Sequence, residues 1–372
     1  MPSFNNSKFR IMQITDIQDS VFTSQDTINL IDAALDYAKP DLVIFTGDQF
    51  KAYGVTAHIG NRAKNAEKTI SNILAPLIKR KVPFIYTYGN HDRNAVVTER
   101  IQDKYYRQTP LCLNDSCYSR LGENEVLTFP VYNSEGRVEK VIVLIDSCKK
   151  EGGYFYVSDE QMDFLDSTLS ELNEEMGKSV SAFIFQHVPV GEMYNILNEV
   201  PEGTPESFEG KNAFHKHYYA LTDEMKSRGE IMGESIGNMN ASSKLFERWV
   251  NNGNIRAAFF GHDHNNSFTG TYKGIDLCYA PGAGFNVYGP GMKRGVRIID
   301  FTEGEEGYTT KALYYEDLCG STVRNKLLFE FYQHAPSSMD AAKPMIRNGS
   351  VALAAIASAL TTAIITSKRK NK

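Results

Sequence analysis

Apolar and polar positions in the N-terminal part of the chain repeat with two periods. Runs of consecutive apolar residues, many of them β-branched or aromatic, predict buried strands, and apolar residues three and four positions apart predict amphipathic helices. We expect strands and helices to alternate here, at residues 9–14, 25–37, 42–46, 62–79 and 84–87. Repeats of strand, helix and strand build parallel sheets.

Beyond residue 120 the pattern predicts a hairpin, followed by further helices and strands. Two strand-like runs, 126–132 and 138–145, are joined by the turn-type sequence Asn133-Ser134-Glu135-Gly136. Two more helices and two more strands are expected, at residues 159–175, 180–185, 242–251 and 255–260. Parallel units followed by a hairpin predict an α/β chain with mixed sheets.

Short polar blocks stand directly after five of the expected strands. They are Asp16-Ile17-Gln18, Gly47-Asp48, Gly89-Asn90-His91-Asp92, Gln186-His187 and Gly261-His262-Asp263-His264. A lone Asp in a turn, or a lone His, is usually an ordinary surface or hydrogen-bonded residue. The joint pattern is different, because it would bring oxygen and imidazole donors from several strand ends to one place. Such convergence builds a two-metal site.

These blocks, in this order, resemble the calcineurin-like metallophosphoesterases over about residues 8–316. Within that family the chain is most similar to the purple-acid-phosphatase-like branch. The supporting segments are Leu144-Ile145-Asp146-Ser147, His187-Val188-Pro189, Leu277-Cys278-Tyr279-Ala280-Pro281-Gly282 and Phe285-Asn286-Val287-Tyr288-Gly289. The resemblance implies a phosphomonoesterase with a four-layer α/β/β/α sandwich of two mixed sheets.

Asp48 is the expected bridge between two divalent cations, because a carboxylate offers two oxygens and Gly47 places it in a tight turn. Two divalent cations outweigh the anionic ligands and attract a phosphate. A water that bridges them becomes hydroxide near neutral pH and attacks phosphorus. The ligands are expected in two sets that share Asp48: Asp16, Gln18 and His264 for one cation, and Asn90, His187 and His262 for the other.

Two positions depart from the family pattern. Gln18 stands where the first block usually has His, or Gly in true purple acid phosphatases. Lys51 stands three residues after Asp48, where purple acid phosphatases have their metal-binding tyrosine, and Tyr53 has the wrong spacing. A ferric-tyrosinate centre is therefore not expected. A glutamine carbonyl suits manganese, iron(II) or magnesium better than zinc, so the two metals could be Mn, Fe, Zn or Mg.

His91 and Asp92 are the expected catalytic residues. His91 follows the ligand Asn90, so it should contact the phosphoryl group or protonate the leaving oxygen, with Asp92 orienting its imidazole. Arg93, and Arg294 after a glycine-rich loop, are candidates for binding the substrate's phosphate, although each could equally be a surface cation.

Composition agrees with an ordinary folded enzyme. The chain has 372 residues, 42% of them hydrophobic, and we expect one catalytic domain over residues 1–316. A net charge of -5 argues against a general nucleic-acid binder. The five cysteines are odd in number and have no patterned spacing, so no disulfide framework is expected, although a Cys112–Cys117 pair remains open.

Two segments lie outside the expected strand and helix pattern. Residues 190–240 read as a lid-like insertion that contains His215, His217, Tyr218 and Tyr219. After an extension over 317–350, residues 351–367 carry no charge and precede a basic tail, 368–372. We expect a marginal transmembrane anchor there, or instead a helix that packs on the protein. Since the N-terminus lacks a signal-peptide pattern, the expected location is a membrane-anchored cytoplasmic enzyme, with a soluble cytoplasmic enzyme as the alternative.

Three functions are compatible with these residues. The favoured one is a metal-dependent phosphatase that hydrolyses phosphomonoesters through a metal-bridging hydroxide, acting on a phosphorylated small molecule or a phosphoprotein. A phosphodiesterase or nuclease would use the same chemistry with a wider pocket. A non-catalytic metal-binding interaction protein is the third, suggested by Gln18 and opposed by retention of the other ligand-type residues.

Overall fold

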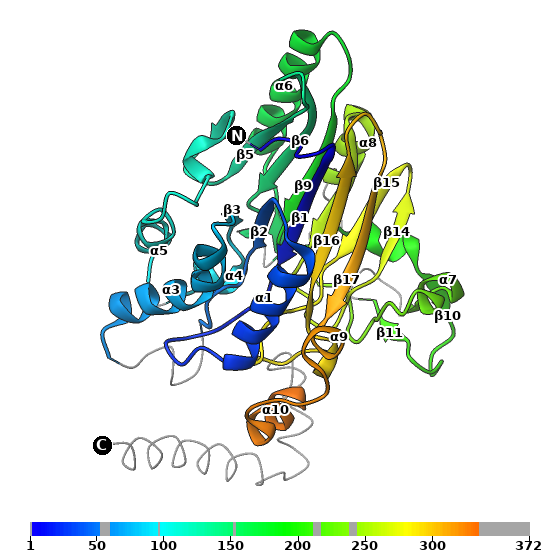
Figure 1. Ribbon diagram of the computed structural model, residues 1–372. Helices are drawn as coiled ribbons and strands as arrows, with labels where there is room; N and C mark the ends of the chain where they lie inside the picture. The colour runs from blue at the N-terminus through cyan, green and yellow to red at the C-terminus, as the bar shows by residue number, and fades with distance from the viewer. Residues whose placement is uncertain are drawn as a thin grey trace. The chain divides into compact units, whose positions relative to one another are not determined.

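Two mixed β-sheets packed face to face, with helices on their outer faces, make up the protein (Figure 1). This computed structural model describes residues 2–52, 60–95, 97–151, 154–210, 217–237 and 244–334. Contacts divide the chain into two units, Met1–Gln333 and His334–Lys372, and His334 is the one described residue of the second. The sheets and helices below belong to the first unit.

The first sheet has five strands in the order β17-β16-β1-β2-β3. Strands β1, β2 and β3 are mutually parallel, and β16 and β17 continue the sheet antiparallel. All five residues of β2 are buried, which explains why its sequence is a continuous apolar run and not an alternating one. The bounds are β1 Lys8–Ile14, β2 Leu42–Thr46, β3 Phe84–Thr87, β16 Gly295–Thr302 and β17 Tyr308–Tyr314.

The second sheet has seven strands in the order β14-β15-β13-β9-β6-β5-β4. Its centre is parallel, from β15 through β13 and β9 to β6, and the hairpin β5–β6 extends it on one side. The bounds are β4 Ser119–Leu121, β5 Val126–Tyr132, β6 Val138–Ile145, β9 Ser181–Gln186, β13 Ile255–Phe260, β14 Thr269–Tyr272 and β15 Ile275–Tyr279.

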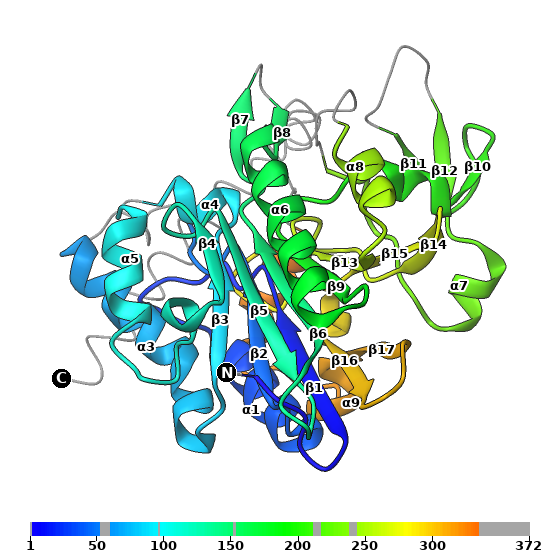
Figure 2. The ribbon, with the colours of Figure 1, turned by 90° about the horizontal axis from the view of Figure 1, so that it is seen from above.

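Helices cover the outer face of each sheet. In Figure 2, α1 (Gln25–Ala38) and α3 (Arg62–Arg80) lie on the side of the five-stranded sheet, and α6 (Asp159–Met176) and α8 (Leu245–Asn252) lie on the other side. Three apolar clusters fill the spaces between successive layers, one under each pair of helices and one between the sheets. The predicted four-layer α/β/β/α sandwich is therefore confirmed.

Helix ends follow local sequence. Ser158 accepts a hydrogen bond from the Gln161 amide, and the Gln161 side chain accepts one from the Ser158 amide, so α6 begins with a reciprocal capping box. Asn61 caps α3 in the same way with one bond, from the Lys64 amide. The shorter helices and turns are α4 Asn90–Arg93, α5 Glu99–Tyr106, α7 Asp223–Ser227, α9 Tyr315–Cys319, α10 Lys326–Gln333, η1 Asn114–Ser116, η2 Gly191–Ile196 and η3 Gly291–Lys293.

The expected insertion contains a small separate sheet in the order β10-β12-β11. The bounds are β10 Asn198–Val200, β11 Phe208–Glu209 and β12 Tyr218–Ala220. In it His217 pairs with Glu199, and the ring of Tyr219 packs on Tyr194. His215 lies outside the described residues. His217 stands directly before β12, and its ion pair joins it to β10.

Two expectations about covalent and membrane features were left open by the sequence. All five cysteines are free thiols, so Cys112 and Cys117 form no disulfide in this structure. None of the helices within the described ranges is both long enough and apolar enough to span a membrane. The anchor expected at residues 351–367 lies outside those ranges.

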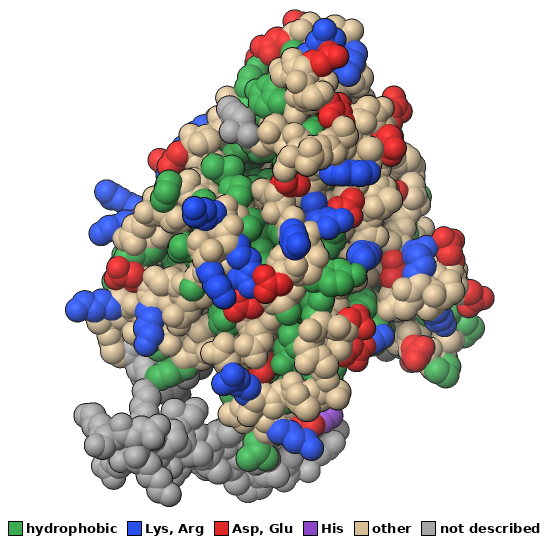
Figure 3. Space-filling model, viewed as in Figure 1, with side chains coloured by type: hydrophobic (Ala, Val, Ile, Leu, Met, Phe, Trp, Pro, Cys, Tyr) green, Lys and Arg blue, Asp and Glu red, His purple; other side chains and the backbone are tan. Residues whose placement is uncertain are grey.

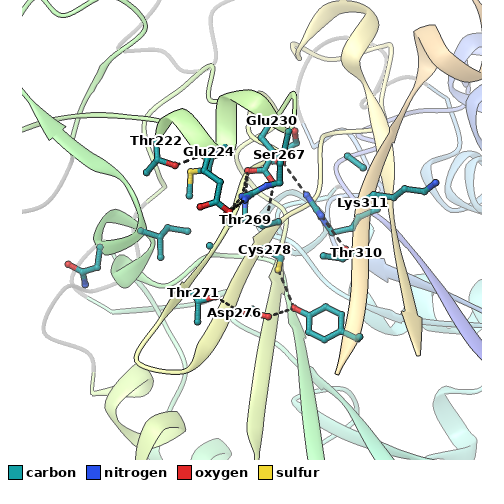
Figure 4. Close-up of a pocket in the computed structure, with 18 of the residues that line it drawn as sticks. Thr222, Glu224, Glu230, Ser267, Thr269, Thr271, Asp276, Cys278, Thr310 and Lys311 are labelled. Carbon is teal, nitrogen blue, oxygen red and sulfur yellow. Dashed lines mark hydrogen bonds and ion pairs between the residues drawn. The ribbon is translucent and has the colours of Figure 1, made fainter. Parts of the chain in front are cut away.

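A polar cavity of about 700 Å³ is lined by residues of β14 and β15 of one sheet and of β16 and β17 of the other (Figure 4). Its polar side chains bond to one another: Asp276 accepts hydrogen bonds from Thr271 and Tyr308, and Glu230 accepts from Thr269. None of the predicted site residues lines it. On the face shown in Figure 3, Lys and Arg are interspersed with Asp and Glu.

Candidate metal centre

The predicted ligand residues all lie at the carboxyl ends of strands. Because β1, β2 and β3 run parallel in one sheet, and β9 and β13 run parallel in the other, these ends meet at one edge of the sandwich. The loops after β1, β2, β9 and β13 and the start of α4 deliver the donors: Asp16, Gln18, Asp48, Asn90, His187, His262 and His264. The structure brings all seven together.

Asp48 lies between the other donors. Its Oδ2 atom is 2.9 Å from Gln18 Nε2, 3.5 Å from His187 Nε2 and 3.9 Å from His91 Nε2. Its Oδ1 atom accepts a hydrogen bond of 2.7 Å from the backbone amide of His91. The carboxylate is fully buried, and although burial alone would raise its pKa, His187 and then His91 hold it well below the usual range. Asp48 is therefore an anion facing both halves of the donor set.

One half of the set contains Asp16, Gln18 and His264. Donor atoms of Asp16, Asp48 and His264 all lie within 4.8 Å of one another, which makes these three a candidate metal site. The NH₂ group of Gln18 donates a hydrogen bond of 3.0 Å to His264 Nε2. Asp16 Oδ1 is buried without a hydrogen-bond donor, 3.2 Å from His264 Nε2. A buried carboxylate oxygen so placed fits a bound cation.

The other half contains Asn90, His187 and His262. His187 Nε2 lies 3.2 Å from Asn90 Oδ1 and 3.3 Å from His262 Nδ1. An amide oxygen and two imidazole nitrogens at this separation are a neutral donor set of the kind that zinc, iron and manganese accept.

Backbone carbonyls orient two of the imidazoles. His187 Nδ1 donates a hydrogen bond of 2.9 Å to the carbonyl of Thr46, and His264 Nδ1 donates one of 2.9 Å to the carbonyl of Tyr288. The ring of Tyr288 also stacks on that of His264 at 4.2 Å. Since Nδ1 carries the proton in each case, Nε2 is left to face the carboxylates as a potential ligand atom.

The same two histidines are protonated more readily than usual. Burial alone would lower the pKa of His187, but Asp48 raises it to about 9. Burial alone would likewise lower the pKa of His264, but Asp16 raises it. The buried carboxylates thus need a neighbouring positive charge, which either protons or metal ions can provide.

Four of the donor residues have left-handed backbone conformations, which non-glycine residues rarely adopt. Asp16, Gln18, Asp48 and His262 have φ angles of 54°, 39°, 57° and 77°. Glycine permits the close approach of two loops: a Cβ on Gly89 would lie 2.0 Å from Asp48 Oδ1. Strained conformations cluster at functional sites because the surrounding fold holds them there.

His91 and Asp92 have different surroundings. The His91 side chain is 29% exposed beside Asp48, so it lies at the rim of the donor set. Burial lowers its pKa, while Asp48 opposes this. Asp92 is buried, and its carboxylate accepts hydrogen bonds from the backbone amides of Asp48, Phe50 and Gly89. These contacts make Asp92 a support of the Asp48 loop.

The two arginines expected at the substrate are both occupied elsewhere. Arg93 pairs with Asp146 and with Glu99, and remains partly exposed. Arg294 is completely buried, and its guanidinium donates hydrogen bonds to the carbonyls of Gly284, Val287 and Gly291. The expectation that Arg294 binds substrate phosphate is thus corrected, because this side chain fixes the glycine-rich loop from the inside.

Further groups hold the donor loops in place. Asp263 accepts hydrogen bonds from the Gly237 amide and the Tyr279 hydroxyl, tying together the loops on either side of His262. The carbonyls of Thr46 and Tyr288 carry no side-chain signature. Only the position of Thr46, directly before Gly47-Asp48, could have indicated its role.

The sandwich and its cluster of carboxylates, amides and imidazoles at one edge define a metallophosphoesterase. The sequence profile described as calcineurin-like phosphoesterase matches residues 9–266, and the chain belongs to this family. The family uses divalent metals, and the site formed by Asp16, Asp48 and His264 is the corresponding candidate here.

Relatives of the chain have both active and inactive names. "Probable inactive purple acid phosphatase 29" of Arabidopsis thaliana is 24% identical over 332 residues, covering 79% of this chain and 77% of that protein. "Phosphatase DCR2" of Saccharomyces cerevisiae is 23% identical over 340 residues, covering 82% of this chain and 54% of that protein. Among solved structures, a dimetal phosphatase from Danio rerio has a TM-score of 0.49 and 13% identity, covering 82% of this chain and 95% of that one.

Proposed function

We propose that the protein is a phosphatase that binds two divalent metal ions and hydrolyses phosphomonoesters. The observation that carries this proposal is the position of Asp48, whose buried carboxylate lies between two donor sets. Asp16, Gln18 and His264 would hold one ion and Asn90, His187 and His262 the other. Bound divalent ions supply Lewis acidity and activate water at neutral pH.

The chain's own residues supply orientation and a proton. The Thr46 and Tyr288 carbonyls hold His187 and His264 with Nε2 directed at the carboxylates. Asp16 and Asp48 are the two anionic donors, so two divalent ions leave a net positive charge that binds a dianionic phosphate. His91, at the rim 3.9 Å from Asp48, is placed to contact the phosphoryl group and to protonate the leaving oxygen.

Two alternatives make different predictions. A phosphodiesterase of the same fold would prefer a substrate with one charge less on phosphorus. A non-catalytic metal-binding interaction protein would bind metal without turnover, and the inactive label in the name of the Arabidopsis relative keeps this alternative in the test. Retention of the ligand-type residues and of His91 favours hydrolysis.

One assay separates the three functions. Purified protein is loaded with manganese, iron, zinc or magnesium and given p-nitrophenyl phosphate or bis-p-nitrophenyl phosphate, with His187→Ala as the matched inactive control. Faster release from the monoester, lost in the control, supports the proposal. Preference for the diester makes the protein a phosphodiesterase, and metal binding without release from either compound makes it non-catalytic.

The substrate is proposed to be a phosphorylated small molecule or a phosphoprotein, presented to a cytoplasmic enzyme. We also propose that the uncharged segment 351–367, followed by the basic tail 368–372, holds the enzyme at a membrane. Fractionation of the full chain and of a chain without residues 346–372 tests this. Recovery of the full chain in the soluble fraction, or of the shortened chain in the membrane pellet, would contradict it.

A further inference from the structure

A two-stranded hairpin contacts the histidine side of the site. Strands β7 (Lys149–Glu151) and β8 (Tyr154–Tyr156) lie side by side (Figure 2). They are antiparallel, and Lys150 lies directly opposite Phe155. The buried ring of Phe155 packs edge-on against the ring of His262, with centroids 5.5 Å apart and planes at 78°. Phe155 thus fixes the hairpin against a donor residue of the site.

The same ring holds a cation. The ammonium of Lys150 lies 4.5 Å from the centre of the Phe155 ring, as a cation over an aromatic face. Successive separations of 4.5 and 5.5 Å place this ammonium within about 10 Å of the His262 ring, about one Debye length at 0.1 M salt. An exposed positive charge at that range acts on an anion bound at the site.

Three other cations among the residues that the structure describes are already neutralised or enclosed. Their partners are Asp146 and Glu99 for Arg93, Glu125 for Lys149, and three backbone carbonyls for Arg294. By contrast, Lys150 is exposed, and no carboxylate among the described side chains pairs with it. Its charge is therefore available to a ligand.

We propose that Lys150 is a specificity-determining residue that binds a second anionic group of the substrate. The preferred substrates are then small phosphomonoesters that carry a carboxylate close to the phosphate, as phosphorylated hydroxy amino acids do. Phosphate binds at the metal centre and the carboxylate binds the ammonium of Lys150. This inference rests on the proposed phosphatase function for its kinetic test, and a binding test is independent of it.

Phosphoserine and phosphoethanolamine are the matched probes, because they differ only in one carboxylate. With manganese-loaded protein we expect KM to be about two- to fivefold lower for phosphoserine, the range of an exposed ion pair. Lys150→Ala removes this preference and Lys150→Glu reverses it, while kcat on p-nitrophenyl phosphate stays unchanged. Lys149→Ala is the matched control on the same strand, and it keeps the preference because Lys149 pairs with Glu125.

The binding test uses calorimetry of the same two compounds with manganese-loaded protein in a His91→Ala background, where turnover is slow. A preference for phosphoserine that Lys150→Ala abolishes supports the inference even if the protein hydrolyses neither compound, in which case only the proposed function fails. Hydrolysis with equal KM and equal affinity for both compounds, or a preference that survives Lys150→Ala, overturns the inference and leaves the function intact. Binding of neither compound overturns the inference, and the assay with p-nitrophenyl phosphate then decides the proposed function separately.

Discussion

Asp92 holds the backbone that presents Asp48. Its Oδ2 atom accepts a hydrogen bond of 2.6 Å from the amide of Asp48 and its Oδ1 atom accepts one of 2.9 Å from the amide of Phe50. Oδ2 also accepts a bond from Gly89, at the start of the loop that carries Asn90 and His91. One buried carboxylate thus connects two loops of the metal centre, which explains why Gly-Asn-His-Asp ends in Asp.

Asp92→Asn should weaken metal binding. An amide offers one oxygen instead of two, and its NH₂ group would face a backbone N–H, so at least one buried donor loses its acceptor at a cost of about 1–3 kcal/mol. We expect lower metal content, measured by elemental analysis after dialysis, and a lower denaturation midpoint. Glu160→Gln on α6, an exposed position, is the control. Full metal content in Asp92→Asn would show that the Asp48 loop does not depend on this carboxylate.

Much of the site was predictable because its signal is local. Where a strand-like run is followed by Asp or by Asn-His, the sequence identifies both the donor side chain and the strand end that carries it. The order of strands in the two sheets then brings these ends together. The alternation of apolar runs and helical patterns similarly predicted the bounds of α1 and β5 to within a residue.

The partners of single charged residues were not predictable in this way. Arg294 stands after glycines in a sequence typical of an anion-binding loop, and the chain instead turns its guanidinium inward onto three carbonyls. That choice depends on loop conformations set by distant packing, including the aromatic rings of Phe285 and Phe329 beside the guanidinium. The role of Asp92 likewise depends on the path of a loop 44 residues away.

His91→Ala should slow turnover while leaving the metals in place. If His91 contacts the phosphoryl group and protonates the leaving oxygen, its removal should lower kcat by about 100- to 10,000-fold. Metal content should stay near that of the wild type. His217→Ala, which removes the histidine directly before β12, is the matched control and should keep full activity. Loss of metal together with activity would instead make His91 a ligand or a structural residue.

Gln18→His should tighten zinc binding at the site shared with Asp16. The NH₂ group of Gln18 lies 2.9 Å from Asp48 Oδ2 and 3.0 Å from His264 Nε2, so this side chain reaches the donor set. Imidazole is a better zinc ligand than an amide oxygen. Zinc titration with a chelating indicator should show a lower Kd for one of the two ions. Identical stoichiometry and affinity in the two proteins would remove Gln18 from the ligand set.

Arg294→Leu should destabilise the fold and leave phosphate recognition unchanged. Three buried carbonyls would lose their donor, at a cost of at least about 3 kcal/mol in the free energy of unfolding. Urea unfolding measures this cost, and KM for p-nitrophenyl phosphate in the folded fraction should match the wild type. The neighbouring Lys293→Leu is the control and should shift neither quantity. A large rise in KM with unchanged stability would restore Arg294 as a substrate contact.

Lys51 makes the stability of the fold vary with pH in the alkaline range. Its ammonium is buried where it donates hydrogen bonds to the Asn286 carbonyl and the Tyr332 hydroxyl, and burial lowers its pKa from 10.5 to about 8. Below pH 8 the folded protein therefore contains a buried charge, which lowers its free energy of unfolding. Between about pH 8 and 10.5 the unfolded chain binds the proton and the folded protein does not, so the free energy of unfolding rises with pH.

Comparison of wild type with Lys51→Met isolates this effect, because other titrating groups are common to both proteins. Measured by urea unfolding of metal-free protein, the wild type should gain about 2–3 kcal/mol relative to Lys51→Met between pH 7.5 and 10, from about 1.4 kcal/mol for each unit of pKa shift. Lys311→Met, at an exposed position on β17, should show no such trend. Parallel pH profiles for wild type and Lys51→Met would mean that the Lys51 ammonium keeps its ordinary pKa in the folded protein.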